Sequence, residues 1–68
     1  MKIIDARGLS CPEPVIMLRQ AMATEAAAYQ LLVDNHASKE NTLRYGEHAG
    51  YTVTIEEKGE EYTLTFTK

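Results

Sequence analysis

The sequence lacks the covalent and apolar features that anchor a secreted or membrane-bound small protein. Its 68 residues include one cysteine, Cys11, so no disulfide can form within the chain. A chain this short buries only ~60% of its unfolded surface, and secreted domains of this size usually depend on disulfides. The unpaired thiol therefore favours a reducing, cytoplasmic location. No apolar run approaches the ~20 residues that cross a bilayer, and no signal peptide is visible, so we expect a soluble protein.

An excess of basic residues is also missing. Ten acidic residues stand against seven basic ones, which gives a formal net charge of −3. Nucleic-acid binding usually requires a basic surface, so we expect neither a nucleic-acid partner nor a membrane partner. The two histidines, His36 and His48, are too few to complete a zinc site of about three or four ligands. We expect no metal.

The spacing of the apolar residues divides the chain into six elements in the order βαβαββ. Apolar residues alternate with threonines in two late segments, which is typical of half-buried strands. Gly59, between these segments, predicts a hairpin turn with a positive φ angle. Strands are predicted at 3–5, 29–33, 51–56 and 62–67, and helices from Pro12 to about Met22 and from an N-cap at Ser38 to Gly50.

This order predicts one α/β domain over residues 1–68, an α+β two-layer sandwich. The first strand–helix–strand unit should form a right-handed parallel crossover. Both helices then pack on one face of a mixed four-stranded sheet, and the threonine-rich sides of the last two strands face water. The predicted core consists of Val15, Leu18, Met22, Leu31, Val33, Leu43, Val53, Ile55, Leu64 and Phe66.

The most informative segment is 8–14, where the cysteine meets the start of the first helix. Proline is favoured at the first helical position, which would make Cys11 the N-cap, Pro12 the first residue and Pro14 the third. Prolines have no amide N–H, so the amides of Glu13 and Val15 would point toward the sulfur. An N-cap side chain usually accepts from the second or third residue, and the Glu13 amide is the expected donor.

This position favours an ionised thiol. A helix N-terminus carries partial positive charge, and cysteines placed there often have lowered pKa values. The carboxylate of Glu13 opposes this effect, whereas Arg7 would support it if the loop at Gly8 folds back. The simpler alternative is that Cys11 is an ordinary small residue and that both prolines only mark the start of a helix.

The segment 5–15 resembles the signature of the TusA family of sulfur carriers, also called SirA-like proteins. The resemblance implies the same βαβαββ fold and a Cys-Pro-x-Pro motif, which Cys11, Pro12 and Pro14 match. Asp5, Arg7 and Gly8 loosely match the acid-lined segment that precedes this motif in the family. It also implies that the cysteine accepts sulfur as a covalent persulfide, without another cofactor, and passes it on. The implied partners are an upstream persulfide donor, such as a cysteine desulfurase, and a downstream acceptor protein.

Later segments resemble the N-terminal domain of YedF-type proteins more than TusA itself. These segments are 33–35, 38–41 and 50–51. YedF-type proteins are sulfurtransferase-like, are associated with selenium metabolism and usually carry a second domain. Asn35-His36 stands where TusA commonly has Asp-Pro. Asp34 and Asn35 are candidates for partner docking because they follow the second strand at an edge expected near Cys11, although a turn or cap role is the simpler interpretation.

Three functions follow from the sequence. The first is a sulfur carrier, or a selenium carrier, that works through Cys11; whether it turns over as an enzyme is left open. The second is a binding or regulatory module that uses the Cys-Pro-x-Pro edge as a docking surface. The third, a peroxide-sensing thiol, has little support because no second cysteine is present to resolve a sulfenic acid.

Overall fold

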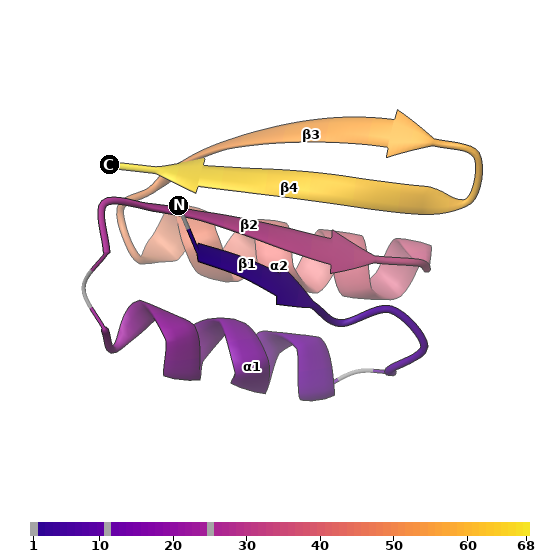
Figure 1. The fold of residues 1–68 in the computed structure, drawn as a ribbon, viewed down its shortest axis with the longest axis horizontal. Coiled ribbons are helices and arrows are strands. Elements are labelled where there is room, and N and C mark those ends of the chain that lie inside the picture. Colours follow the sequence, from indigo (N-terminus) through magenta and orange to yellow (C-terminus); the bar gives the residue numbers. More distant parts are fainter. Residues whose placement is uncertain (1, 11, 25) are drawn as a thin grey trace.

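The computed structural model describes residues 2–10, 12–24 and 26–68 and confirms the predicted order of elements (Figure 1). Each strand and each helix lies within a few residues of its predicted position. The elements are β1 (Lys2–Asp5), α1 (Glu13–Met22), β2 (Ala28–Val33), α2 (His36–His48), β3 (Thr52–Lys58) and β4 (Glu61–Thr67).

The four strands form one mixed sheet in the order β1-β2-β4-β3. β1 pairs with β2 in parallel, and β4 pairs antiparallel with both β2 and β3. Both helices pack on the same face of this sheet, as predicted (Figure 1). The register places Leu31 of β2 beside Ile4 on one side and Leu64 on the other, so apolar side chains line up across the strands on the helical face.

The core lies between the sheet and the helices. Of the ten predicted core residues, five are fully buried in this layer, namely Leu18, Leu31, Val33, Leu64 and Phe66. Three more, Met22, Leu43 and Val53, contact it from its rim, and Val15 is only half-buried outside it. Ile55 was predicted wrongly: its side chain is 37% exposed, because β3 is an edge strand with a neighbour on one side only. The buried hydrophobic residues are Ile4, Ala6, Leu18, Ala21, Tyr29, Leu31, Val33, Tyr51, Leu64 and Phe66; Met22, Leu43 and Val53 are partly buried against them.

Both helices begin at residues other than those predicted. α1 begins at Glu13, one residue later than expected, and Pro12 precedes it with φ −98°. α2 begins at His36, and its N-cap is Asn35 rather than Ser38, because the Asn35 side-chain oxygen accepts a hydrogen bond from the Ser38 N–H at 2.8 Å. Ser38 itself faces the core and is buried.

Two glycines fix particular points of the fold. Gly59 turns the β3–β4 hairpin with φ +64°, as predicted. Gly46, within α2, allows the helix to approach the sheet closely: a Cβ atom there would overlap the ring of Phe66 and lie 3.3 Å from Val53 Cγ2. Gly46 is therefore required for the contact between α2 and β4.

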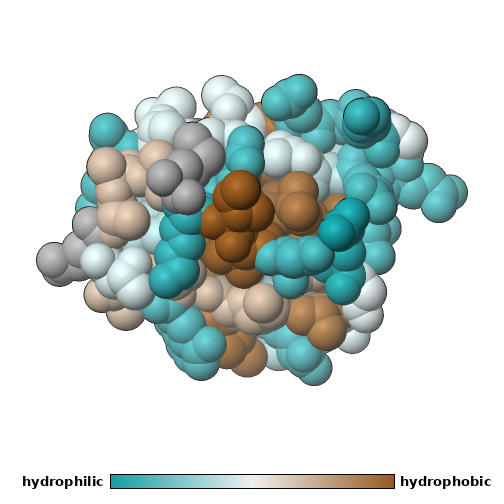
Figure 2. Space-filling model, in the orientation of Figure 1, coloured by the Kyte–Doolittle hydropathy of each residue, from teal (hydrophilic) through white to brown (hydrophobic). Residues whose placement is uncertain are grey.

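The face of the sheet opposite the helices is open. Its residues include Thr52, Thr54 and Thr67, which are exposed, so the threonine-rich sides face water as predicted. Figure 2 shows a hydrophobic patch over β1 on an otherwise largely hydrophilic surface, and Ile3 of β1 is 63% exposed. Across the described residues, neither helix has the length and apolar character of a membrane span.

Candidate functional site

The Cys-Pro-x-Pro motif belongs to the end of the molecule where β1 leads through a loop to α1 (Figure 1). Cys11 lies outside the described residues, so its predicted N-cap position and its thiol are not described. Its neighbours Ser10 and Pro12 are both exposed, whereas the side chain of Pro14 is fully buried. The motif therefore joins an exposed loop to a helix whose first turn is anchored in the core.

The first turn of α1 differs from the arrangement that the sequence predicted. Pro12 precedes the helix and Pro14 is its second residue. The Glu13 N–H, which was expected to donate toward the sulfur, instead donates to the Ser10 carbonyl at 3.0 Å. The Pro12 carbonyl accepts from the Ile16 N–H at 3.0 Å. The hydrogen bond from Glu13 ties the exposed Ser10 to the first residue of α1.

Arg7 is held by two carboxylates at this end. Its guanidinium forms two hydrogen bonds with Asp5, from Nε at 2.9 Å and from NH2 at 2.8 Å, and NH1 lies 3.4 Å from Glu61 Oε1. The hydrogen bonds from the Arg7 side chain and backbone lower the pKa of Asp5 to about 2, and the same contact with Asp5 raises the pKa of Arg7. Most donor groups of Arg7 are thereby committed to carboxylates.

Asp34 and Asn35 brace the loop from the turn after β2. The Gly8 N–H donates to Asp34 Oδ2 at 2.7 Å, and Gly8 has φ +80°, a conformation that favours glycine. The Asn35 side-chain amide donates to the Leu9 carbonyl at 3.3 Å while its oxygen caps α2. The structure therefore brings Asp34, Asn35 and Gly8 together; a role of Asp34 and Asn35 in partner docking stays a prediction.

A groove between the two helices, which we call the interhelical groove, starts at Pro12. It has a volume of about 410 Å³. Sequence reasoning missed it, although its α2 residues recur at the spacing of one helical face, because that spacing does not tell which face meets α1. The lining residues are Pro12 and Val15 from the start of α1 and Asn41, Arg44, Tyr45 and His48 from α2.

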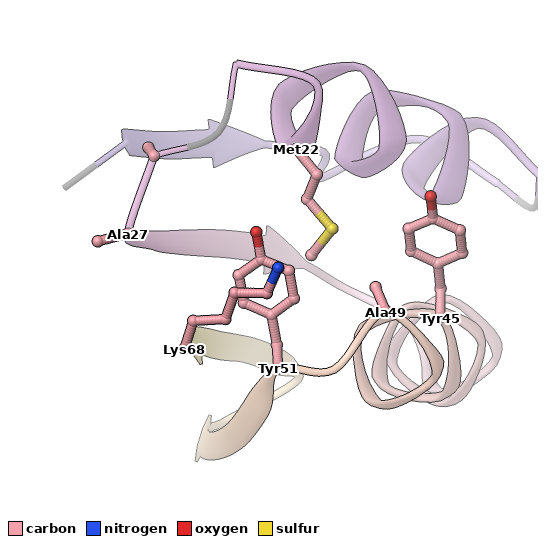
Figure 3. A pocket seen from close by; sticks show the side chains of 7 residues that line it. Met22, Ala27, Tyr45, Ala49, Tyr51 and Lys68 are labelled. Carbon is pink, nitrogen blue, oxygen red and sulfur yellow. The ribbon is translucent and has the colours of Figure 1, made fainter.

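A second cavity lies at the opposite end of the molecule, between the ends of the two helices and the end of β4 (Figure 3). Its volume is about 360 Å³. The Lys68 Nζ atom lies 4.9 Å from the centre of the Tyr51 ring, and the Tyr51 ring meets the Tyr29 ring edge to face at 5.8 Å. The Tyr29 hydroxyl accepts a hydrogen bond from the Ala26 N–H at 2.8 Å. This end is packed around the rings of Tyr29 and Tyr51.

The two histidines are far apart in the fold. His36 is the first residue of α2 and lies 3.5 Å from Glu40, whereas His48 is the last residue of α2 and lines the interhelical groove. Among residues 2–10, 12–24 and 26–68, no three His, Cys, Asp or Glu side chains gather in the way that metal ligands would.

Comparisons with known proteins agree with this architecture. The model of the family described as "Sulfurtransferase TusA" matches residues 2–68. A protein of Methanocaldococcus jannaschii named "Putative sulfur carrier protein" is 34% identical over 62 residues, which are 88% of this chain and 83% of that protein. The crystal structure of a SirA-like protein from Desulfitobacterium hafniense superposes with a TM-score of 0.90 at 35% identity, covering 98% of this chain and 96% of that one.

Proposed function

The chain belongs to the TusA family, and on that premise we propose that it is a sulfur carrier that accepts sulfur as a persulfide on Cys11 and passes it to a partner protein. The observation that carries this proposal is the Cys-Pro-x-Pro motif at residues 11–14, directly before the N-terminus of α1 in a chain of this family. Pro12, Glu13 and Pro14 form the start of the helix, and Gly8 and Arg7 belong to the loop that precedes it.

The surroundings of Cys11 suit a sulfur that must be reached by large partners. Ser10, Pro12 and Glu13 are exposed, so a partner can approach the motif from solvent. The partial positive charge at the start of α1 favours an anion, whether a thiolate or a persulfide. Arg7 contributes less than its charge suggests, because Asp5 and Glu61 already neutralise it. The helix N-terminus is thus the main support for the anion.

The transfer is an exchange between sulfur atoms that needs no outside oxidant or reductant. The Cys11 thiolate attacks the terminal sulfur of the donor's persulfide. A new S–S bond forms to Cys11 as the donor's S–S bond breaks, and the donor leaves as a thiolate with the electron pair of the broken bond. The proton of the terminal sulfur stays with it or passes to solvent. An acceptor thiolate then repeats the attack on the Cys11 persulfide and restores the Cys11 thiolate.

The chemistry requires partners rather than a bound cofactor. Docking holds two sulfurs at reacting distance, and proximity then supplies most of the rate. We propose a cysteine desulfurase as the upstream donor, a downstream acceptor protein, and the cytoplasm as the location, since a reducing compartment keeps the thiol free. The same exchange can carry selenium, which the resemblance to YedF-type proteins makes worth testing with a donor that holds selenocysteine-derived selenium as a perselenide, so that its S–Se bond breaks as the bond to Cys11 forms.

The test is intact-protein mass spectrometry after the reduced protein is mixed with a cysteine desulfurase and cysteine. We expect the wild type to gain one sulfur that a reductant removes, and Cys11→Ser to gain none while its thermal stability stays unchanged. If the desulfurase and a small persulfide such as glutathione persulfide both fail to load the wild type, the carrier proposal is wrong. The function would then be that of a binding module at the Cys-Pro-x-Pro edge.

A further inference from the structure

The interhelical groove combines an apolar lining with one cationic side chain, Arg44. Pro12, Val15 and the Tyr45 ring supply apolar surface, while Arg44 and His48 stand along α2. None of the described residues that line it carries a carboxylate. Its volume of about 410 Å³ lies within the ~300–1,000 Å³ that is usual for ligand-binding pockets.

Among the described residues, Arg44 pairs with no other group. Arg7 pairs with Asp5 and Glu61, and Lys39 and Lys68 each lie over a tyrosine ring. Within the part of the chain that the structure describes, Arg44 forms neither an ion pair nor a side-chain hydrogen bond, and its nearest carboxylate-bearing neighbour in the adjoining surface hollow is Glu47. An exposed guanidinium in this state presents a fork of donors that fits a carboxylate.

The groove is also continuous with the motif. Pro12 lines it and directly follows Cys11 in the chain. A segment that occupies the groove is therefore held next to the residue that receives sulfur. The chain as a whole has a net charge of −3, so Arg44 is a local positive group that favours an acidic partner segment.

We propose that the interhelical groove receives an extended segment of the upstream persulfide donor, with an apolar side chain over Pro12 and Val15 and a carboxylate paired with Arg44. The inference rests on the proposed function and adds to it the chemistry of the donor segment that is recognised. Arg44 is a positioning residue here: it acts by orienting the donor and takes no part in the exchange between the sulfurs.

The experiment compares the rates at which two donors load Cys11. One donor is a cysteine desulfurase with cysteine, which must dock; the other is glutathione persulfide, which is too small to need the groove. The proteins are the wild type, Arg44→Glu and the matched control Lys2→Glu, which reverses an exposed charge on β1 at the far end of the molecule. Each substitution lowers the net charge by two. Any difference in loading rate between the two variants therefore results from the position of the substituted residue and not from the total charge of the protein.

We expect Arg44→Glu to slow loading by the desulfurase about tenfold at low salt, and this difference to shrink as salt is raised. Loading by glutathione persulfide should proceed at the wild-type rate in all three proteins, and Lys2→Glu should behave as wild type with both donors. Equal desulfurase rates for Arg44→Glu and Lys2→Glu would overturn the inference, as would a wild type that glutathione persulfide loads and the desulfurase does not. In both cases loading by glutathione persulfide would leave the carrier function intact.

Discussion

At the end of the molecule that carries the Cys-Pro-x-Pro motif, hydrogen bonds and ion pairs hold the chain, whereas the opposite end is packed around buried aromatic side chains. The motif end joins the loop after β1 to the turn after β2 through Asp34 and Asn35, and Arg7 joins the same loop to the start of β4 through Glu61. The aromatic end packs Tyr29, Tyr51 and Phe66.

This difference suggests that the aromatic end mainly stabilises the fold and that the motif end mainly serves the chemistry. Burial of aromatic side chains contributes more to folding than exposed hydrogen bonds do, because each ring removes a large apolar area from water. The exposed loop bonds fix local geometry instead, and they leave the motif accessible. We therefore expect substitutions at the aromatic end to lower stability with little effect on loading, and substitutions at the motif end to do the opposite.

The largest loss of stability should come from Gly46→Ala, at the contact between α2 and the ring of Phe66. Alanine favours a helix over glycine by about 1 kcal/mol, but overpacking against a buried ring costs about 3 kcal/mol, so we expect a net loss of about 2 kcal/mol. Urea denaturation measures it. In a Phe66→Leu background the penalty should shrink, because the smaller side chain makes room. A stabilised Gly46→Ala protein would show that helix propensity outweighs the close contact.

An intermediate effect is expected at Asn35, which contributes to both the fold and the loop. Asn35→Ala removes the N-cap of α2, at a cost of about 1 kcal/mol, and also the hydrogen bond to the Leu9 carbonyl. Asn35→Asp keeps an oxygen for the cap but loses the donor to Leu9. We expect only the alanine variant to lose stability in urea, and both variants to load more slowly in the mass-spectrometric assay. Wild-type loading in both would contradict a positioning role for this bond.

The smallest effect should be the pH dependence of the Asp5–Arg7 contact. The pKa of Asp5 in the folded protein is lowered from 3.8 to about 2, so the contact stabilises the fold fully above the ordinary pKa and loses this contribution as the pH falls through 2. The melting temperature of the wild type should exceed that of Asp5→Asn at neutral pH, and the two should converge in acid. An Asp5 carboxyl resonance that titrates at its ordinary pKa would contradict the contact.

The sequence predicted the elements and their arrangement because both depend on local patterns. Alternation of threonine with Val53, Leu64 and Phe66 specifies strands with one buried side, and this pattern survives any error in the strand ends. Gly59 marks the hairpin because its positive φ angle is rarely adopted by other residues. The prediction of Ser38 as the N-cap of α2 was wrong because asparagine and serine both cap helices well. Only the tertiary structure shows that Ser38 faces the core and that Asn35 caps the helix.

The details of the site required packing that no local pattern contains. Arg44 and His48 line a groove because of the face that α2 turns toward α1. This face depends on how the two helices cross, which the sequence of either helix alone does not predict. The exposure of Ile55 follows from the position of β3 at the edge of the sheet. The bond from Gly8 to Asp34 joins residues 26 positions apart, and it exists because the parallel pairing of β1 and β2 brings their ends together.

The strand order also constrains how the protein acquires its structure during synthesis. β4 follows all the other elements in the chain, yet it lies inside the sheet between β2 and β3. Until β4 has left the ribosome, β3 has no neighbouring strand and the core lacks Leu64 and Phe66. The first five elements therefore cannot form the complete sheet by themselves. Folding is therefore completed only after translation has passed Thr67, and the distant pairing of β4 with β2 slows it relative to a helical protein of equal length. During this interval the edges of β2 and β3 are open to other chains, and a chaperone that shields them would raise the yield of native protein.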